Sequence, residues 1–157
     1  MSSGSALYSV VIVDDEALAR AGLHSLIDWG SRGFEIVGEA ENGEEGRTLV
    51  ERVKPDLAIV DIRMPVLGGI ALMEAIRTIS PETRVIVLSS YDEFEYAREA
   101  MKHGAIDYLL KLELTAEQLG SVLDRAKDRL IARESPGEEQ GVSPADLAEV
   151  LMDPAQR

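Results

Sequence analysis

The stretch P-D-L-A-I-V-D-I-R-M-P at residues 55–65 carries a short apolar run into an aspartate and then into a loop. The run 57–61 is too short for a helix and nearly all apolar, which is typical of a strand buried on both faces of a sheet. Runs of the same kind occur at 7–13, 34–40, 84–88 and 106–110. We therefore expect five strands of similar character.

Amphipathic stretches separate and follow these runs. Their apolar residues repeat at helical spacing and are expected to pack on the sheet. Among them are Ala19, Leu23, Leu26 and Ile27 in the first stretch and Phe94, Ala97 and Met101 in the fourth. Alternation of strands and helices favours βαβ units. The sequence thus predicts an α/β fold with a doubly wound, five-stranded parallel sheet and five helices.

Two helix starts are marked by capping residues. Asn42 with Glu45, and Thr115 with Gln118, have the spacing of an N-cap residue and its partner three positions later. At the other end of the fourth helix, Gly104 tolerates the left-handed conformation of a C-terminal cap. These signals predict where the second, fourth and fifth helices begin or end.

Composition changes at both ends of the chain. Residues 1–5 look like a flexible or vector-derived lead, and 6–133 form the ordered domain. Residues 134–143 are rich in Pro, Gly and acids, which predicts a linker because such a segment buries little apolar surface. Residues 144–157 are expected to form a short helical extension or the start of a truncated output region.

The overall composition excludes several classes of function. Of 157 residues, 45% are apolar, enough to cover both faces of a central sheet, and the net charge of −13 argues against a nucleic-acid surface within these residues. The absence of cysteine excludes thiolate zinc sites and disulfides. No apolar run is as long as a membrane span and no leader is visible, so a cytoplasmic protein without membrane contact is expected.

Polar residues stand at the ends of four predicted strands. They are Asp14, Asp15, Asp61, Ser89 and Lys111. In a parallel sheet these ends share one edge, and ligands bind there, near the point where the strand order reverses. We expect the five side chains to meet in one acidic pocket.

The chemistry of this pocket suits phosphoryl transfer. Three carboxylates without Cys or clustered His favour a hard cation, Mg²⁺ or also Mn²⁺, and Mg²⁺ keeps waters that phosphoryl oxygens can replace. Asp61 is the expected nucleophile towards phosphorus. Lys111 and Ser89 are expected to hold phosphoryl oxygens, and the backbone carbonyl of Arg63 is a further candidate metal ligand.

The combined motifs resemble the receiver domain of two-component response regulators. They are V-D-D-E at 13–16, P-D-L-A-I-V-D-I-R-M-P at 55–65, V-I-V-L-S-S-Y at 85–91 and D-Y-L-L-K at 107–111. The stretches 28–43 and 89–97 further resemble receivers that precede an arabinose-regulator-type helix-turn-helix domain. The resemblance implies a flavodoxin-like sheet of strand order 2-1-3-4-5, with 6–133 as the receiver domain.

Roles for matching residues follow from this resemblance. Asp61 matches the phosphoacceptor, Asp15 the direct metal ligand and Asp14 its acidic neighbour, and the carbonyl of Arg63 matches the backbone metal ligand. Lys111 matches the family's lysine. Two further matches are switch residues: Ser89 is the switch hydroxyl and Tyr108 the aromatic switch.

The resemblance also implies partners. Similar proteins accept phosphate from a sensor histidine kinase and catalyse only their own phosphotransfer and dephosphorylation, so the chain is not expected to be an enzyme in the usual sense. A homodimer through the fourth helix, fifth strand and fifth helix is expected. DNA would be bound only by an output domain, for transcription regulation, that these residues do not contain.

Two positions depart from the family pattern. Leu112 follows Lys111 where the family usually has proline, so the loop must orient the lysine in another way. Ser90 replaces a smaller residue and is expected to alter access of water to an acyl phosphate.

Two alternative functions stay open. A phosphatase with an aspartyl-phosphate intermediate also uses carboxylates at strand ends, but it needs a second Asp two residues after the nucleophile, where Arg63 stands. A phosphorylation-independent interaction module would keep the fold without the chemistry. His24 and His103 lie on predicted helices and are expected to be surface residues.

Overall fold

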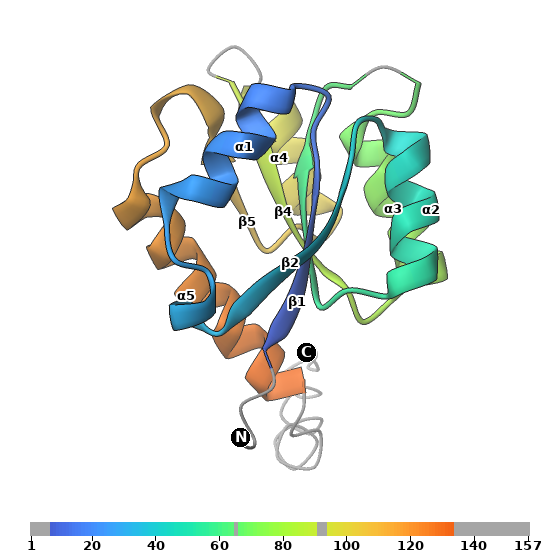
Figure 1. The fold of residues 1–157 in the computed structure, drawn as a ribbon. Helices are drawn as coiled ribbons and strands as arrows, with labels where there is room; N and C mark the ends of the chain where they lie inside the picture. The colour runs from blue at the N-terminus through green and yellow to red at the C-terminus, as the bar shows by residue number, and fades with distance from the viewer. Residues whose placement is uncertain (1–6, 65, 91–93, 134–157) are drawn as a thin grey trace, which may run out of the picture. The chain divides into compact units, whose positions relative to one another are not determined.

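A five-stranded, all-parallel sheet forms the centre of the protein in a computed structural model that describes residues 7–64, 66–90 and 94–133 (Figure 1). Its strand order is β2-β1-β3-β4-β5. The strands are β1 (Tyr8–Val13), β2 (Phe34–Ala40), β3 (Leu57–Asp61), β4 (Arg84–Ser89) and β5 (Asp107–Leu110). The predicted flavodoxin-like, doubly wound fold is confirmed.

Helices connect consecutive strands. They are α1 (Ala17–Leu26), α2 (Gly43–Val53), α3 (Gly69–Ile79), α4 (Phe94–Lys102) and α5 (Ala116–Arg133), with short 3₁₀ turns η1 (Gly30–Arg32) and η3 (Lys111–Glu113). The chain divides after Asp124 into two compact units, and all five strands lie in the first. α1 covers one face of the sheet, and α2, α3 and α4 cover the other (Figure 1).

The predicted caps are present. The Asn42 side chain accepts a hydrogen bond from the backbone N–H of Glu45 at 2.8 Å. Thr115 and Gln118 form a reciprocal capping box, with both bonds 3.1 Å long. Gly104 has a φ of 106°, the left-handed conformation expected after α4.

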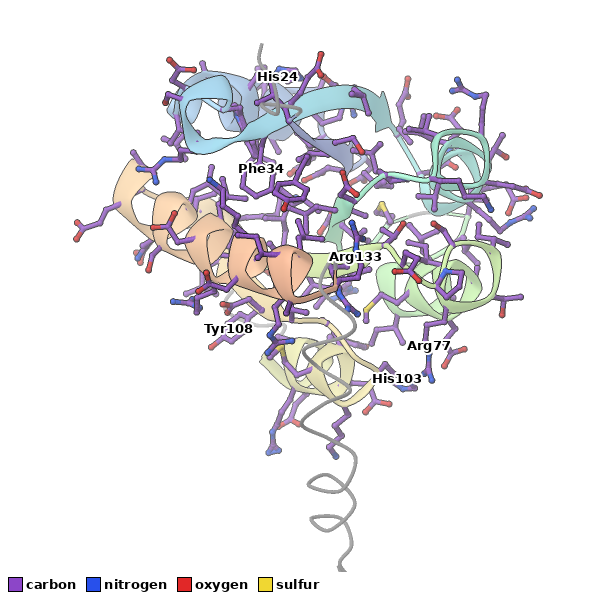
Figure 2. All side chains as sticks on the ribbon, turned by 90° about the horizontal axis from the view of Figure 1, so that it is seen from below. His24, Phe34, Arg77, His103, Tyr108 and Arg133 are labelled. Carbon is purple, nitrogen blue, oxygen red and sulfur yellow. The ribbon has the colours of Figure 1, made fainter. Side chains whose placement is uncertain are left out.

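The prediction of uniformly buried strands is wrong for the two edge strands. β1, β3 and β4 are almost wholly buried, whereas β2 and β5 alternate between buried and exposed residues. An edge strand has a neighbour on one side only, and the helices cover it incompletely. Phe34, the first residue of β2, is nevertheless buried (Figure 2) and packs on Tyr8, with ring centroids 5.9 Å apart.

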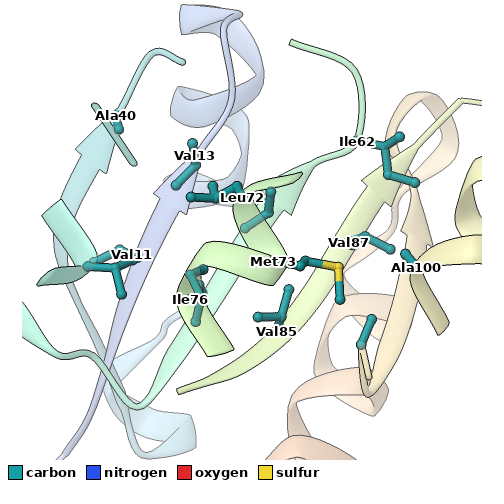
Figure 3. Close-up of a cluster of buried hydrophobic side chains, with 14 of the residues drawn as sticks. Val11, Val13, Ala40, Ile62, Leu72, Met73, Ile76, Val85, Val87 and Ala100 are labelled. Carbon is teal, nitrogen blue, oxygen red and sulfur yellow. The ribbon is translucent and has the colours of Figure 1, made fainter. Parts of the chain in front are cut away.

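The core between the sheet and the helices α2, α3 and α4 is built mainly from small and branched residues. Figure 3 shows Val11 and Val13 of β1 and Val85 and Val87 of β4 on the same side as Leu72, Met73 and Ile76 of α3. All of these side chains are at most 5% exposed. Burial of such side chains removes apolar area from water and supplies most of the driving force that holds the helices on the sheet.

Some predicted core positions are less buried than expected. In α1 Leu23 is buried, whereas Ala19, Leu26 and the following Ile27 are only partly buried. In α4, Ala97 is buried as predicted, but Met101 is 40% exposed and the prediction for it is wrong. The side chain of Phe94 lies outside the described part of the structure, as do residues 1–5, the linker 134–143 and the extension 144–157.

Candidate functional site

The carboxyl ends of four parallel strands bring the predicted residues together. Asp14 follows β1 directly, and Lys111 follows β5. Asp61 is the last residue of β3, as in the predicted run 57–61, and Ser89 is the last residue of β4, one position beyond the predicted run 84–88. The pairing of Asp61 with Leu88, the residue before Ser89, sets this alignment.

Asp14, Asp15 and Asp61 form a compact group of carboxylates. One oxygen from each lies within 4.8 Å of the others. Asp14 and Asp61 are buried, and Asp15 is exposed to solvent. The Asp14 Oδ1 atom accepts a hydrogen bond from the backbone N–H of Glu16 at 2.9 Å, while its buried Oδ2 atom accepts none from the described residues. Such an oxygen-only group fits a hard divalent cation, but these contacts do not select one metal.

Lys111 lies at the centre of the acidic group. Its Nζ atom is 3.2 Å from Asp61 Oδ2, 3.2 Å from Asp14 Oδ2 and 2.7 Å from Glu16 Oε1. Leu112, which stands in place of the family's proline, is 80% exposed and takes no part in this group. The lysine is therefore held by three carboxylates, those of Asp14 and Glu16 in the turn after β1 and that of Asp61 at the end of β3.

Glu16 is a site residue that the sequence reasoning missed. Its shorter contact with Lys111 makes it the nearest of the three acids to the ammonium group. The only signal in the sequence is that Glu16 continues the acidic triplet begun by Asp14 and Asp15. An acid at this position could equally be a first-turn residue of α1, so the pairing becomes evident only from the fold.

Burial and crowding change the ionisation of the site. Desolvation, together with the charge of Asp14, raises the pKa of Asp61 to about 7 from its ordinary 3.8. Desolvation also raises the pKa of Asp14. Burial alone would lower the pKa of Lys111, but the hydrogen bond to Glu16 and the charges of Asp61 and Asp14 outweigh it and raise that pKa. The metal-free site therefore holds more negative charge than one lysine can compensate.

Ser89 presents an unused hydroxyl group. Its Oγ atom is buried and has no hydrogen-bond partner among the described residues. A buried polar atom without a partner carries a desolvation cost, and such atoms occur where a ligand is expected. A hollow of about 290 Å³ lies beside Asp61 and is bordered also by Asp15, Glu16, Arg63, Ser90, Lys111 and Leu112, whereas Asp14 and Ser89 are not among the residues that line it.

Two glycines allow the loop after Asp61 to pack closely. A Cβ atom on Gly69 would lie 2.5 Å from the backbone oxygen of Asp61, and one on Gly43 would lie 1.9 Å from the backbone oxygen of Leu67. Real Cβ atoms do not approach backbone oxygens so closely. The loop is also strained at Val66, a β-branched residue with a φ of 74°.

The remaining predicted residues lie around this pocket. Tyr108 is 38% exposed at the outer edge of β5 and is not among the residues that border the pocket (Figure 2). The Arg63 side chain is exposed, and its guanidinium lies over the Tyr96 ring. The two histidines make partly exposed ion pairs, His24 with Glu39 and His103 with Glu74 and Glu99, as expected for surface residues.

Within the described residues, no helix is both long and apolar enough to cross a membrane.

Known proteins are similar to this chain in sequence. The transcriptional regulatory protein HptR of Staphylococcus aureus is 39% identical over 129 residues, which are 82% of this chain and 50% of HptR. The uncharacterized transcriptional regulatory protein YesN of Bacillus subtilis is 39% identical over 105 residues, 67% of this chain and 28% of YesN. The chain thus spans half or less of the length of these two curated relatives.

Solved structures agree with these relatives. The receiver domain of AraT, a response regulator from Geobacillus stearothermophilus, superposes with a TM-score of 0.77 at 39% identity, covering 82% of this chain and 98% of that one. A two-component transcriptional regulator AraC from Clostridium phytofermentans has a TM-score of 0.74 at 29% identity, covering 81% and 98%. Residues 10–123 match the response regulator receiver domain, and the chain belongs to that family.

Proposed function

We propose that this chain is a phosphorylation-activated signalling switch in which Asp61 accepts a phosphoryl group from a sensor histidine kinase. Receiver domains of two-component systems interact with such kinases, and this chain belongs to their family. The observation that carries the proposal is a buried carboxylate 3.2 Å from a lysine, inside a group of acids at the edge of the sheet.

Different residues of the pocket have different roles in phosphoryl transfer. A carboxylate oxygen of Asp61 attacks phosphorus, the bond from phosphorus to the kinase's histidine nitrogen breaks, and the imidazole leaves with that electron pair. Lys111 balances the charge of the transferred oxygens, and the Ser89 hydroxyl donates a hydrogen bond to one of them. Ser90 borders the same hollow and controls the approach of the water that later hydrolyses the acyl phosphate.

A divalent cation belongs in this proposal. Asp14, Asp15, Asp61 and the backbone carbonyl of Arg63 would hold Mg²⁺, with Mn²⁺ as a substitute. Bound there, the cation would neutralise the carboxylates and provide positions for phosphoryl oxygens. The support from the structure is the excess of acids over lysine and the raised pKa of Asp61.

The output lies outside the described residues. The names of HptR and YesN describe transcriptional regulators, so we propose that this receiver controls a DNA-binding domain, in the cytoplasm. Ser89 and Tyr108 would change position on phosphorylation and reshape the surface of α4, β5 and α5, where a homodimer would form. Tyr96, Met101 and Tyr108 expose apolar area there.

Binding of a phosphate mimic tests the proposal. Beryllium fluoride should bind the protein only with Mg²⁺ present, and Asp61→Asn should abolish binding, as measured by titration calorimetry. Asp124→Asn is a matched control, because the Asp124 carboxylate is 72% exposed and pairs only at 3.7 Å with Arg32. Equal binding by Asp61→Asn, or none by the parent protein, would disprove the mechanism. Turnover of phosphate esters would favour a phosphatase instead.

A further inference from the structure

The loop that follows the proposed phosphoacceptor is in contact with α4. Arg63 stands two residues after Asp61, and its Cζ atom lies 5.6 Å from the centre of the Tyr96 ring, near the start of α4. This is within the range of a cation–π interaction. Both side chains are exposed, Tyr96 by 48%, so the interaction is a weak one.

Arg63 also borders the hollow that contains Asp61 and Lys111. It is thus shared between two sites, the carboxylate group on one side and the aromatic ring of α4 on the other. In the unmodified protein Lys111 is already held by Asp61, Asp14 and Glu16. A new phosphoryl group would add further negative charge close to the loop that carries Arg63.

The packing of α4 makes it sensitive to such a contact. Among the α4 side chains that the structure describes, those buried in the core are the alanines Ala97 and Ala100. Alanine side chains bury little area, so these two residues contribute little to the anchoring of α4. Just past its last residue, His103 lies 3.4 Å from Glu74 of α3, which ties the far end of α4 to its neighbour. Arg63 provides a corresponding contact near the beginning.

We propose that Arg63 is a charge sensor that links phosphorylation of Asp61 to α4 through Tyr96. In the unmodified state the guanidinium lies on the Tyr96 ring. In the phosphorylated state the phosphoryl oxygens attract it, because a charge-assisted hydrogen bond to phosphate is stronger than an exposed cation–π contact. Tyr96 is then released, and the N-terminal half of α4 loses an anchor. This inference rests on the proposed phosphorylation of Asp61.

Fluorine NMR of protein labelled with 3-fluorotyrosine tests whether Arg63 links Asp61 to Tyr96. The protein contains four tyrosines, so 3-fluorotyrosine gives four resonances, and Tyr96→Phe identifies the one from Tyr96. Adding Mg²⁺ and beryllium fluoride should produce a bound-fluoride signal and, in the same spectrum, a shift of the Tyr96 resonance. Arg63→Met removes the guanidinium while keeping the backbone carbonyl. In this variant the Tyr96 resonance should be displaced before the mimic is added, and its shift on binding should fall by at least half.

Arg98→Met is the control, since Arg98 lies on the same helix as Tyr96, carries the same charge as Arg63 and pairs with Glu95 at 3.8 Å. It should keep the full Tyr96 shift. An equal shift in Arg63→Met and the parent, with fluoride bound in both, would overturn the sensor role while leaving the phosphoacceptor intact. No bound fluoride in the parent would overturn the proposed function, and this inference with it.

Discussion

Replacing Asp61 by asparagine should stabilise the metal-free protein at pH 8, although the residue is at the centre of the site. The pKa of Asp61 is raised from 3.8 to about 7, with burial as the largest cause. Between these two values the folded protein holds a proton that the unfolded chain has released. Stability therefore falls as pH rises through this window, and above about pH 7 the loss is complete.

The size of the effect follows from the pKa shift. Each pKa unit corresponds to about 1.4 kcal/mol, so a shift of roughly three units sets an upper limit of about 4 kcal/mol. Part of the raised pKa of Asp61 comes from the charge of Asp14, and asparagine loses the ion pair with Lys111, which reduces the gain. We expect Asp61→Asn to raise the free energy of unfolding by about 1 to 2 kcal/mol at pH 8, or the midpoint temperature by about 3 to 8 °C.

Urea unfolding with a metal chelator, at intervals from pH 4 to pH 8, measures this difference. The gain should be smallest near pH 4, where the folded parent is protonated at this position and the unfolded chain is only about half ionised. It should then grow up to about pH 7 and stay constant above. Asp124→Asn should differ from the parent by less than about 0.5 kcal/mol throughout. A gain that does not depend on pH, or a loss of stability at pH 8, would refute the reasoning.

Three other substitutions, one of them with a matched control, probe the surroundings of the site. Gly43→Ala should destabilise the protein by about 1 to 3 kcal/mol in urea unfolding, because the new Cβ would lie 1.9 Å from a backbone oxygen. Gly22→Ala in α1 is the control, since a Cβ there would meet no atom within 4 Å, and it should stabilise the protein by about 0.5 to 1 kcal/mol. Similar losses in both would contradict the packing argument. Ser89→Ala should change stability by less than about 1 kcal/mol, because its hydroxyl has no hydrogen-bond partner among the described residues, yet weaken calorimetric binding of the phosphate mimic roughly tenfold. Glu16→Gln removes a negative charge that competes for Lys111, so the anionic mimic should bind about threefold tighter, and weaker binding would speak against that competition.

The parallel sheet and the pocket were predictable because their signals are local and repeated. Five apolar runs with helical stretches between them require a covered parallel sheet, and the ends of parallel strands share an edge. The proximity of Asp14, Asp61 and Lys111 can therefore be predicted from these local signals. Capping residues such as Asn42 are equally local, since their partner is three positions away.

Features that depend on long-range neighbours were not predictable in the same way. The partial exposure of β2 and β5 follows from their place at the sheet edges, which single strands do not encode. Met101 has the spacing of a core residue, yet its side chain is exposed while that of the neighbouring Ala100 is buried. The contact of Arg63 with Tyr96 and that of Glu16 with Lys111 join segments that are far apart in sequence, and no motif pairs these residues with each other.

The central claim is that Asp61 receives a phosphoryl group. Incubation with Mg²⁺ and a small phosphodonor such as acetyl phosphate, followed by measurement of the intact mass, tests it most directly. The account predicts a gain of one phosphoryl group in the parent and in Asp124→Asn, and none in Asp61→Asn. No gain in the parent, or the same gain in Asp61→Asn, would contradict it.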